Sequence, residues 1–537
     1  MPYLLIKDIR LPIKEGEEQA IQEAKNRLEG IIGNAHIRGF EIHKRSIDAR
    51  RRGNITVVWS VTAELSCEEL PTDILREAGI SILAGSDLDI ESGTETLSDR
   101  PVVVGFGPAG MFAALLLAER GYRPIVIERG DDTDERIRKV EHFCKTGKLD
   151  AESNIQFGAG GAGTFSDGKL VTRITDSRCR YVLKRFAEFG APKEIMSQAK
   201  PHVGTDVLRK VVSRMRDEIL SLGGEIIFRC AMRGYKTDSA GNIISVTTDK
   251  GDIPCGALIL ATGHSARDTY EYLIKANCNI EEKPFSVGVR IEHLRRDIDT
   301  AMYGSAKLAD KLGHAEYACS HRQNNRGVYT FCMCPGGEVV AAASEEGGVV
   351  VNGMSHHARN GRNSNSAIAV SVSPEDCKAF GGTMAFQRHI ERAAFKLGGS
   401  SYRAPIQTVG DYLAGKHGTE PTKIKPTYME NGLGTTLADL STLFPDYIND
   451  MLRIGIRKFN SHVSGFSASE AILTGPETRT SAPYKILRNE VGTAAGHPNL
   501  YPTGEGAGYA GGITSAAVDG IAQASEIIKR FAPPKNN

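Results

Sequence analysis

The sequence predicts a multidomain protein of mixed α/β and α+β class. Its 537 residues exceed what one hydrophobic core usually serves. A strand–glycine–helix pattern begins only about a hundred residues into the chain, around residues 99–130. A second glycine-rich stretch, followed by a helical pattern, lies near the C-terminus at 501–531. We therefore expect a separate N-terminal unit, and a central domain whose last part is contributed by the end of the chain.

Composition excludes several classes of protein. The net charge of +1 provides no general attraction to nucleic acid or to an acidic membrane surface. The ten cysteines show neither disulfide-framework nor zinc spacing, which suits a reducing compartment. No signal-peptide pattern and no run of eighteen apolar residues occurs, and His356 and His357 are adjacent rather than four apart. We expect a cytoplasmic protein without membrane contact and without a bound metal.

Residues 1–90 are predicted to form a small α/β domain of ferredoxin-like type. Ala20, Ala24 and Leu28 recur at helical spacing within 17–32. Strand-like patterns surround this helix at 3–11, 36–48 and 54–65. The acidic stretch 84–99 contains glycine and serine and has the composition of a linker.

The pattern at 99–130 predicts a Rossmann-like dinucleotide-binding unit. Gly105, Gly107 and Gly110 form G-x-G-x-x-G between an apolar strand and an apolar helix. These glycines permit a tight turn, close approach of a pyrophosphate, and packing of helix against strand. The second strand ends at Glu128, whose carboxylate can accept hydrogen bonds from ribose hydroxyls and would repel a 2′-phosphate.

A second literal match, at Gly158, Gly160 and Gly163, lacks the apolar helix that should follow it. It predicts a glycine-lined loop, either structural or placed against a planar ligand. Further on, the strand-like stretches 225–232, 243–248 and 257–263 predict a β-meander that ends in a buried strand.

Four motifs, GFGPAG, ERG, ALILATGHS and YPTGEGAGYAGGI, look like the FAD-binding scheme of many flavoproteins. Together with GAGGAGTFSDGKL and the region around FCMCPGG, they resemble a bacterial family of FAD-dependent dehydrogenases, also described as NAD(FAD)-utilising dehydrogenase-like flavoproteins. The resemblance extends over almost the whole chain. It implies tightly bound FAD and leaves the substrate open.

The resemblance implies a domain order and a set of FAD contacts. The domains are an N-terminal domain (1–90), the first part of the FAD-binding domain (97–285), an inserted mixed substrate or cap domain (286–455), and the C-terminal return of the FAD-binding domain (456–537). The pyrophosphate would be held by Gly105, Gly107, Pro108, Ala109 and Gly110. The adenosine would be held by Glu128, Arg129 and the backbone near Met232, at the end of the first meander strand.

The remaining implied contacts lie closer to the flavin. Gly160, Gly161, Gly163 and Thr164 would approach the ring, and Ala261, Thr262 and Gly263 would close over the dinucleotide. Near the C-terminus these contacts are Glu505, which stands where many relatives carry Asp, and Gly506, Gly512 and Ile513. A helix starting near Ile513 could direct its dipole at the ring.

The predicted activity is hydride transfer between FAD and a small organic substrate, with NAD(P)H as a possible transient partner. No second nucleotide fingerprint and no C-x-x-C motif occurs. Cys332 and Cys334 would point to the same face of a strand, and we expect small buried hydrophobes rather than a redox pair.

Arg479 and Glu477 are the candidate catalytic residues, because the stretch GPETRTSAP precedes the C-terminal motif. Arg479 could clamp a carboxylate or an enolate, and Glu477 could either orient Arg479 or donate a proton. Arg290 and Arg322 are alternative anchors, and each of these charges could instead form a structural ion pair.

An alternative function is suggested by the basic stretch 44–54, which contains Lys44, Arg45 and Arg50 to Arg52. It could contact RNA phosphates, which would make the protein a flavoprotein that acts on or senses RNA. Since aromatic residues for base stacking are absent there, we expect a solvated hairpin end and no nucleic-acid partner.

Overall fold

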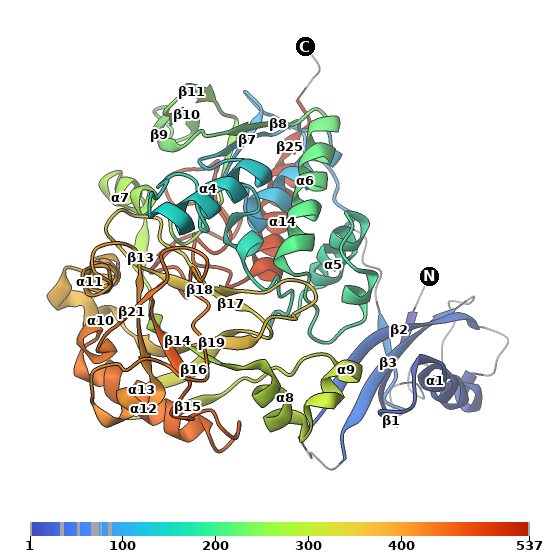
Figure 1. The fold of residues 1–537 in the computed structure, drawn as a ribbon. Coiled ribbons are helices and arrows are strands. Elements are labelled where there is room, and N and C mark those ends of the chain that lie inside the picture. The colour runs from blue at the N-terminus through green and yellow to red at the C-terminus, as the bar shows by residue number, and fades with distance from the viewer. Residues whose placement is uncertain are drawn as a thin grey trace.

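The computed structural model describes residues 3–32, 37–50, 54–65, 75, 78–83 and 88–534. Figure 1 shows a small N-terminal sheet beside a larger body, in which a helix-covered parallel sheet lies above a broad, mostly antiparallel sheet. Among the described residues, no helix has the length and apolar character that crossing a membrane requires.

The N-terminal sheet has the strand order β2-β3-β1-β4, packed on one described helix. Its elements are β1 (Tyr3–Pro12), α1 (Glu17–Ile32), β2 (Ile37–Asp48), β3 (Thr56–Leu65) and β4 (Ser81–Leu83). Ala20, Ala24 and Leu28 of α1 are fully buried against this sheet, as their helical spacing predicts. The strand order fits the predicted ferredoxin-like arrangement.

A second sheet has five parallel strands in the order β24-β12-β6-β7-β8. They are β6 (Pro101–Val104), β7 (Ile125–Glu128), β8 (Glu225–Phe228), β12 (Ala257–Leu260) and β24 (Leu500–Pro502). Every residue of β6, β12 and β24 is buried, as expected for a parallel sheet covered on both faces.

Two helices from opposite ends of the sequence pack together on this sheet. They are α3 (Pro108–Glu119), which follows β6, and α14 (Ile513–Arg530), which begins where the sequence predicts. A Cβ atom at Gly520 would lie 2.1 Å from the carbonyl oxygen of Ala109, so the two backbones touch there. The contact brings the C-terminal glycine motif next to the fingerprint.

The predicted β-meander is wrong in its outer strands. The first expected strand, 225–232, is divided, because β8 joins the parallel sheet and Met232 begins a new strand. The observed meander consists of β9 (Met232–Thr237), β10 (Ile243–Thr248) and β11 (Gly251–Pro254). The stretch 257–263 instead supplies β12 to the centre of the parallel sheet.

The stretch 286–455, predicted to be a mixed inserted domain, contributes most of a seven-stranded sheet, ordered β15-β16-β19-β14-β22-β20-β21. Its strands are β14 (Phe285–Leu294), β15 (Ser320–Gln323), β16 (Arg326–Cys334), β19 (Asn363–Val372), β20 (Ala404–Thr408), β21 (Thr435–Leu437) and β22 (Ile472–Glu477). Because β22 pairs with β14 here, the predicted boundary at 456 is too early. The chain rejoins the parallel sheet only at β24.

Three two-stranded ribbons and ten further α-helices complete the described fold. The ribbons are β5 (Glu95–Thr96) with β25 (Phe531–Ala532), β13 (Ile280–Glu282) with β23 (Tyr484–Ile486), and β17 (Glu338–Ala341) with β18 (Val351–Met354). The helices are α4 (Thr133–Thr146), α5 (Arg178–Glu188), α6 (Thr205–Ser221), α7 (Arg267–Lys275), α8 (Arg295–Tyr303), α9 (Ala309–Leu312), α10 (Pro374–Cys377), α11 (Thr383–Leu397), α12 (Val409–Ala414) and α13 (Asp446–Phe459).

Residues 84–87 of the predicted linker lie outside the described residues, and the rest is packed against the protein. From Leu88 onward it packs against the helices of the parallel sheet, where Arg120 donates hydrogen bonds to the carbonyl oxygens of Leu88 and Ile90. The ribbon of β5 with β25 ties the same segment to the end of α14. The N-terminal sheet also touches the body, through backbone hydrogen bonds between Arg45 and residues 197–199.

Candidate functional site

One cavity opens at the carboxyl ends of the parallel strands. The residues that directly follow four of these strands line it, namely Gly105, Arg129, Ala261 and Thr503. In open parallel sheets, ligands bind at the carboxyl ends of the strands. They bind where the strand order reverses, so that successive connections run to opposite sides of one strand. Here that strand is β6, with β7 on one side and β12 on the other.

The opposite wall of the cavity comes from the seven-stranded sheet and its neighbours. It contains Cys332 from β16, Asn352 from β18, Glu477 at the end of β22, and Arg479. The cavity therefore lies between two sheets whose sequences are interleaved along the chain. Ligand sites concentrate at such junctions.

The three fingerprint positions require glycine for different structural reasons. Gly105 has a φ of +101°, and a Cβ there would lie 2.4 Å from the carbonyl oxygen of Ala261. A Cβ at Gly110 would lie 1.9 Å from the carbonyl oxygen of Gly105. At Gly107 the nearest atom would be the Cα of Gly161, at 3.7 Å. The fold itself therefore requires Gly105 and Gly110, whereas Gly107 leaves free space toward the cavity, as close approach of a pyrophosphate needs.

Two helix N-termini border the same cavity. Helix α3 begins at Pro108 after Gly107, and α14 begins at Ile513 after Gly512, whose φ is +140°. Neither helix has a side-chain cap, and all four residues line the cavity. Uncapped N–H groups and the positive ends of two helix dipoles favour negatively charged groups.

Glu128 is held in place by backbone N–H groups. Its Oε2 accepts from the N–H of Phe106 at 2.8 Å, and its Oε1 accepts from Gly130 and Gly158, both at 2.9 Å. An ionised carboxylate has about four acceptor positions, so one remains for a ribose hydroxyl. The carboxylate is 5% exposed and lines the cavity.

Arg129 and Met232, predicted at the adenosine, both line the cavity. The guanidinium of Arg129 lies 4.4 Å from the centre of the Phe157 ring and pairs with Glu152 at 2.8 Å and Asp268 at 2.5 Å. These contacts fix a planar cation at this end of the cavity. Met232 lies at the start of β9, and not at the end of a strand as predicted.

Four of the expected cofactor residues support the cavity without lining it. They are Gly110, Gly160, Thr164 and Gly506. The hydroxyl of Thr164 donates to the carbonyl oxygen of Ala159 at 3.1 Å, and a Cβ at Gly160 would overlap that hydroxyl. A Cβ at Gly506 would lie 2.5 Å from the carbonyl oxygen of Gly263. These residues pack the loops that form the walls.

The other expected cofactor residues do line the cavity. They are Gly105, Gly107, Pro108, Ala109, Glu128, Arg129, Gly161, Gly163, Met232, Ala261, Thr262, Gly263, Glu505, Gly512 and Ile513. Gly161 and Gly163 belong to a 3₁₀ turn, Gly161–Phe165, so the second glycine motif is a tight loop against the fingerprint.

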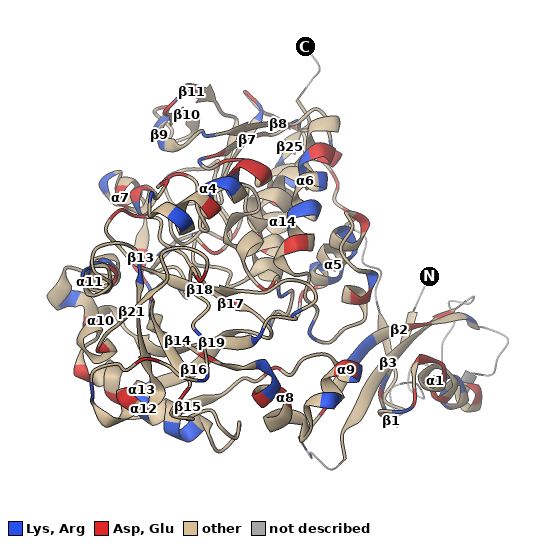
Figure 2. Ribbon diagram, viewed as in Figure 1, with Lys and Arg blue, Asp and Glu red and all other residues tan. Residues whose placement is uncertain are grey.

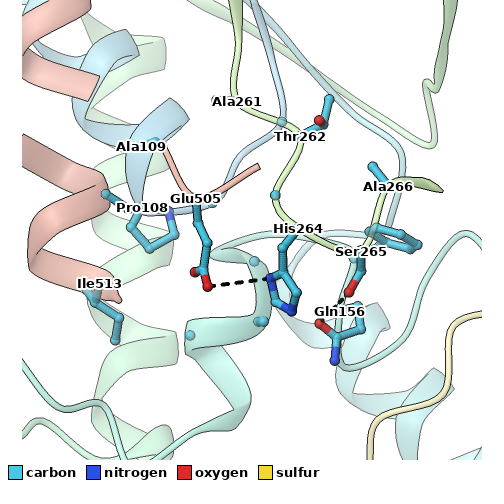
Figure 3. A pocket seen from close by; sticks show the side chains of 18 of the residues that line it. Pro108, Ala109, Gln156, Ala261, Thr262, His264, Ser265, Ala266, Glu505 and Ile513 are labelled. Carbon is cyan, nitrogen blue, oxygen red and sulfur yellow. Dashed lines mark hydrogen bonds and ion pairs between the residues drawn. The ribbon is translucent and has the colours of Figure 1, made fainter. Parts of the chain in front are cut away.

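Glu505 and His264 face each other inside the cavity (Figure 3), with Oε1 and Nδ1 3.9 Å apart. Burial raises the pKa of Glu505 to about 7, although the nearby Lys283 opposes the shift. Burial lowers the pKa of His264 to about 4, and Arg479 lowers it further. In the described structure, Nε2 of His264 is buried without a hydrogen-bond partner, which suits a ligand group as its missing partner.

Arg479 belongs to a buried charge cluster. Its guanidinium donates to both carboxylate oxygens of Glu391 at 3.2 Å and also to the hydroxyl of Ser344. Arg267 donates to the same two oxygens of Glu391 at 2.8 Å. Burial alone would raise the pKa of Glu391, but Arg267 and Arg479 hold it well below its usual value.

Glu477 does not orient Arg479, and that alternative is wrong. It pairs instead with Arg290, with Nε 2.6 Å from Oε2 and Nη2 3.3 Å from Oε1. Burial raises the pKa of Glu477, and Arg290 opposes the shift. Arg290 is fully buried beside the cavity, whereas Arg322 lies exposed on the edge strand β15 and does not line it.

Several cavity residues carried no clear signal in the sequence. His264 and Gln156 follow buried or loop segments, and Asp167 and Lys169 lie in the glycine loop. Cys332 was expected to be a buried hydrophobe, but it is half-buried and lines the cavity. Of these residues, Gln156 alone lies outside the quoted motifs, since ALILATGHS contains His264, GAGGAGTFSDGKL contains Asp167 and Lys169, and FCMCPGG contains Cys332.

Comparison with known proteins decides the family. The model "FAD-dependent protein, C-terminal domain-like" matches residues 284–480, and "Domain of unknown function (DUF8436)" matches 4–64. An "Uncharacterized protein" of Clostridium beijerinckii is 49% identical over 501 residues, which cover 92% of this chain and 93% of the relative. The chain belongs to this family of FAD-dependent proteins. The family resemblance predicted from the motifs is thus confirmed.

Solved structures that resemble this FAD-dependent protein have low identity. An L-amino acid deaminase from Proteus vulgaris is 12% identical, with 84% of this chain and 94% of that chain covered and a TM-score of 0.35. A glycine oxidase from Geobacillus kaustophilus is 11% identical, with 81% and 96% covered and a TM-score of 0.34. CtdE in complex with FAD is 11% identical, with 80% and 82% covered and a TM-score of 0.32.

The basic stretch behind the RNA alternative is partly engaged in contacts within the protein. Arg50 pairs with Asp48 at 2.5 Å, and the guanidinium of Arg45 lies 5.7 Å from the centre of the Trp59 ring. Residues 51–53 lie outside the described residues. In Figure 2 basic and acidic residues are mixed over the visible helices. The RNA alternative gains no support from the comparisons.

Proposed function

We propose that this protein is an FAD-dependent oxidoreductase that transfers hydride between bound FAD and a small organic substrate. One observation supports the proposal above all others. A single cavity is lined on one side by a dinucleotide-type backbone and on the other by the buried charges of a second sheet. Cofactor and substrate could therefore meet within one cavity.

The residues on the first wall fit FAD. The N–H groups at the start of α3 and the free space at Gly107 would receive the pyrophosphate, and Glu128 would receive the ribose hydroxyls. Residues 161–163 and the start of α14 would border the flavin ring. When bound, FAD supplies the ability to accept or donate a hydride.

Arg479 is proposed to anchor a negatively charged group of the substrate. Glu391 and Ser344 accept three of its N–H groups and fix the plane of the guanidinium. A guanidinium has five N–H donors, so two remain available toward the cavity. A carboxylate or a developing enolate matches this planar arrangement.

Glu505 is proposed to hold the proton that accompanies hydride transfer. It lines the cavity, and its pKa near 7 lets it exchange a proton at neutral pH. Glu477, the donor suggested by the sequence, is less suited to this task, because Arg290 binds both of its oxygens.

The proposal is tested by the cofactor and its reduction. The purified protein should release FAD, and not FMN, on denaturation. Under anaerobic conditions NADH or NADPH should bleach its flavin absorbance, and a panel of small carboxylic and enolizable substrates should identify an acceptor or a donor. Release of FMN, or of no flavin, would contradict the cofactor assignment. A stable flavin that no nicotinamide and no panel member reduces or reoxidises would contradict the proposed activity.

A further inference from the structure

Cys332 and Cys334 lie at an irregular point of β16, on the cavity wall. The pairing of β16 with β19 shifts between Phe331 and Cys334, so that three steps along β16 match two steps along β19. Such a bulge redirects the side chains that follow it. Cys332 is half-buried and lines the cavity, whereas Cys334 is fully buried behind it.

The backbone at Cys332 is unusual for a residue with a side chain. Its φ of +43° falls in the left-handed region, which cysteine rarely adopts. Strained conformations of this kind cluster at functional sites. The thiol of Cys334 donates to the carbonyl oxygen of Cys332 at 3.3 Å, which helps to hold this conformation.

Several charged groups lie near the two cysteines. Arg290 of β14 donates to the carbonyl oxygen of Cys332 at 3.2 Å and approaches the sulfur of Cys334 at 3.9 Å. Lys169 adds a second cation from the glycine loop, beside Asp167. The acidic neighbours Glu477 and Glu505 face the same space from β22 and from the C-terminal motif.

The balance of these groups favours a thiolate at Cys332. The adjacent side chain of Cys334 lowers the pKa of Cys332, and Arg290 and Lys169 lower it further against the effects of burial and Asp167. The neighbouring thiolate and burial raise the pKa of Cys334. Burial instead raises the pKa of Cys230, the other described cysteine that lines the cavity.

We propose that Cys332 and Cys334 form a redox-active dithiol that reduces a small organic disulfide in the cavity. The Cys332 thiolate attacks one sulfur of the disulfide R–S–S–R, forming a mixed disulfide and releasing RS⁻, which takes up a proton. Cys334 then loses its proton and attacks the Cys332 sulfur. The products are a Cys332–Cys334 disulfide and a second RSH.

Two electrons and two protons are needed to reopen the Cys332–Cys334 disulfide. This inference rests on the proposed function for their source, which is the reduced flavin in the same cavity. The substrate class of the oxidoreductase is thereby narrowed to small disulfides, whose negatively charged groups Arg479 would bind, and to the thiols formed from them. A disulfide between cysteines only two residues apart closes a very short loop, and strained disulfides of this kind are the readily reduced ones.

The first experiment measures thiol reactivity in the full-length protein as purified, by iodoacetamide labelling and peptide mass spectrometry from pH 5 to 9. Cys332 should react at least about tenfold faster at pH 7 than the partly exposed Cys179. The midpoint of its rate against pH should lie below the usual thiol pKa of about 8.5. Cys334→Ala should move the midpoint of Cys332 upward. Equal rates at Cys332 and Cys179, or an ordinary midpoint, would overturn the thiolate assignment.

The second experiment tests the disulfide step with oxidised β-mercaptoethanol as the probe. In the wild-type protein, the mass of the peptide that contains Cys332 and Cys334 should fall by two hydrogens, because the two thiols form a disulfide. Cys334→Ser should instead accumulate the mixed disulfide on Cys332, and Cys332→Ser should form neither. Thermal melting of both variants checks that they are folded. If wild type and Cys334→Ser accumulate the same mixed disulfide, the pair is not a dithiol.

The flavin content of the same samples separates this inference from the proposed function. If the cysteines behave as expected in a protein without FAD, the proposed function fails while the dithiol assignment stands. If FAD is bound and reducible but the cysteines are inert, the dithiol assignment fails alone. Anaerobic reduction of the bound flavin should also reopen a preformed Cys332–Cys334 disulfide, as seen by recovery of both free thiols.

Discussion

The two walls of the cavity are built in different ways. The wall built on the parallel sheet uses backbone: glycines without side chains, two uncapped helix N-termini, and a carboxylate fixed by N–H groups. The wall built on the seven-stranded sheet uses side chains. Arg479 is held from behind by Glu391, which also binds Arg267 of α7, and Glu477 pairs with Arg290. A substitution should therefore affect cofactor retention on the first wall, and turnover and stability on the second.

Gly107→Val should have the largest effect on flavin content. A Cβ is tolerated by the fold at this position, where its nearest neighbour would lie 3.7 Å away, but the branched side chain would occupy the approach of the pyrophosphate. We expect a folded protein whose flavin content falls by more than about tenfold, which corresponds to more than about 1.4 kcal/mol of binding. The matched control is Gly327→Val on β16, where a Cβ would also meet its nearest atom at 3.7 Å. Full flavin content in Gly107→Val would contradict the backbone mode of binding.

Glu391→Gln should cost the most stability. The change leaves Arg267 and Arg479 buried beside each other without the shared carboxylate, and breaking buried pairs costs about 3–5 kcal/mol. Because the pKa of Glu391 is depressed, its contribution is present above the unfolded value near 4.5 and is lost as the pH falls below it. We expect the free energy of unfolding in urea to differ less between Glu391→Gln and wild type at pH 4 than at pH 7. The exposed Glu375→Gln serves as control.

Arg479→Lys should separate turnover from cofactor binding. Lysine keeps the charge beside Glu391 but lacks the planar arrangement of donors, so FAD content should stay constant while substrate-dependent flavin turnover slows by about tenfold or more. Arg388→Lys, in the neighbouring pair with Glu345, does not line the cavity and should turn over normally. Normal turnover in Arg479→Lys would make the residue structural. Arg290 could not replace it as the anchor, because its N–H groups already bind Glu477, Cys332, Asn352 and Asn365.

Glu505→Gln should change how stability depends on pH. The folded pKa of Glu505 is raised from 4.5 to about 7, so the wild-type protein loses stability as the pH rises through this interval. Glutamine carries no charge, so the variant should gain thermal stability relative to wild type at pH 8, by about 1–3 kcal/mol, and little at pH 5. Melting curves at both pH values measure this. A constant difference across pH would show that Glu505 does not titrate in this range.

Removal of the N-terminal sheet should have the smallest effect on the cavity. None of the residues that line the cavity precedes Val104 among the described parts of the chain. A chain that begins at Leu88 keeps β5 and the contacts of Leu88 and Ile90 with Arg120, and it should retain its flavin. A chain that begins at Leu97 loses these contacts and should be less stable. Loss of flavin in the chain that begins at Leu88 would show that the N-terminal sheet supports the wall built on the parallel sheet.

The sequence alone determined the central part of the wall built on the parallel sheet. Residues 101–128 form a strand, turn, helix and strand in continuous order. The approach of Gly105 explains Gly110 within this unit, whereas the close contact at Gly105 comes from the distant Ala261. The helical periodicity of α1 and the glycine start of α14 are likewise local properties. Short-range order of this kind is fixed by residue types a few positions apart.

The charge clusters at the wall built on the seven-stranded sheet were decided only by the tertiary structure. Glu391 of α11 lies 88 residues before Arg479, and Arg267 lies 124 residues before Glu391, so no spacing rule predicts that they share hydrogen bonds. Strand β14 is buried in nine of its ten positions and lacks the alternation that marks a half-exposed strand, and it buries the charged Arg290 and Glu292. Buried charges need partners, and the distant segments that provide them are brought together only by packing of the two sheets.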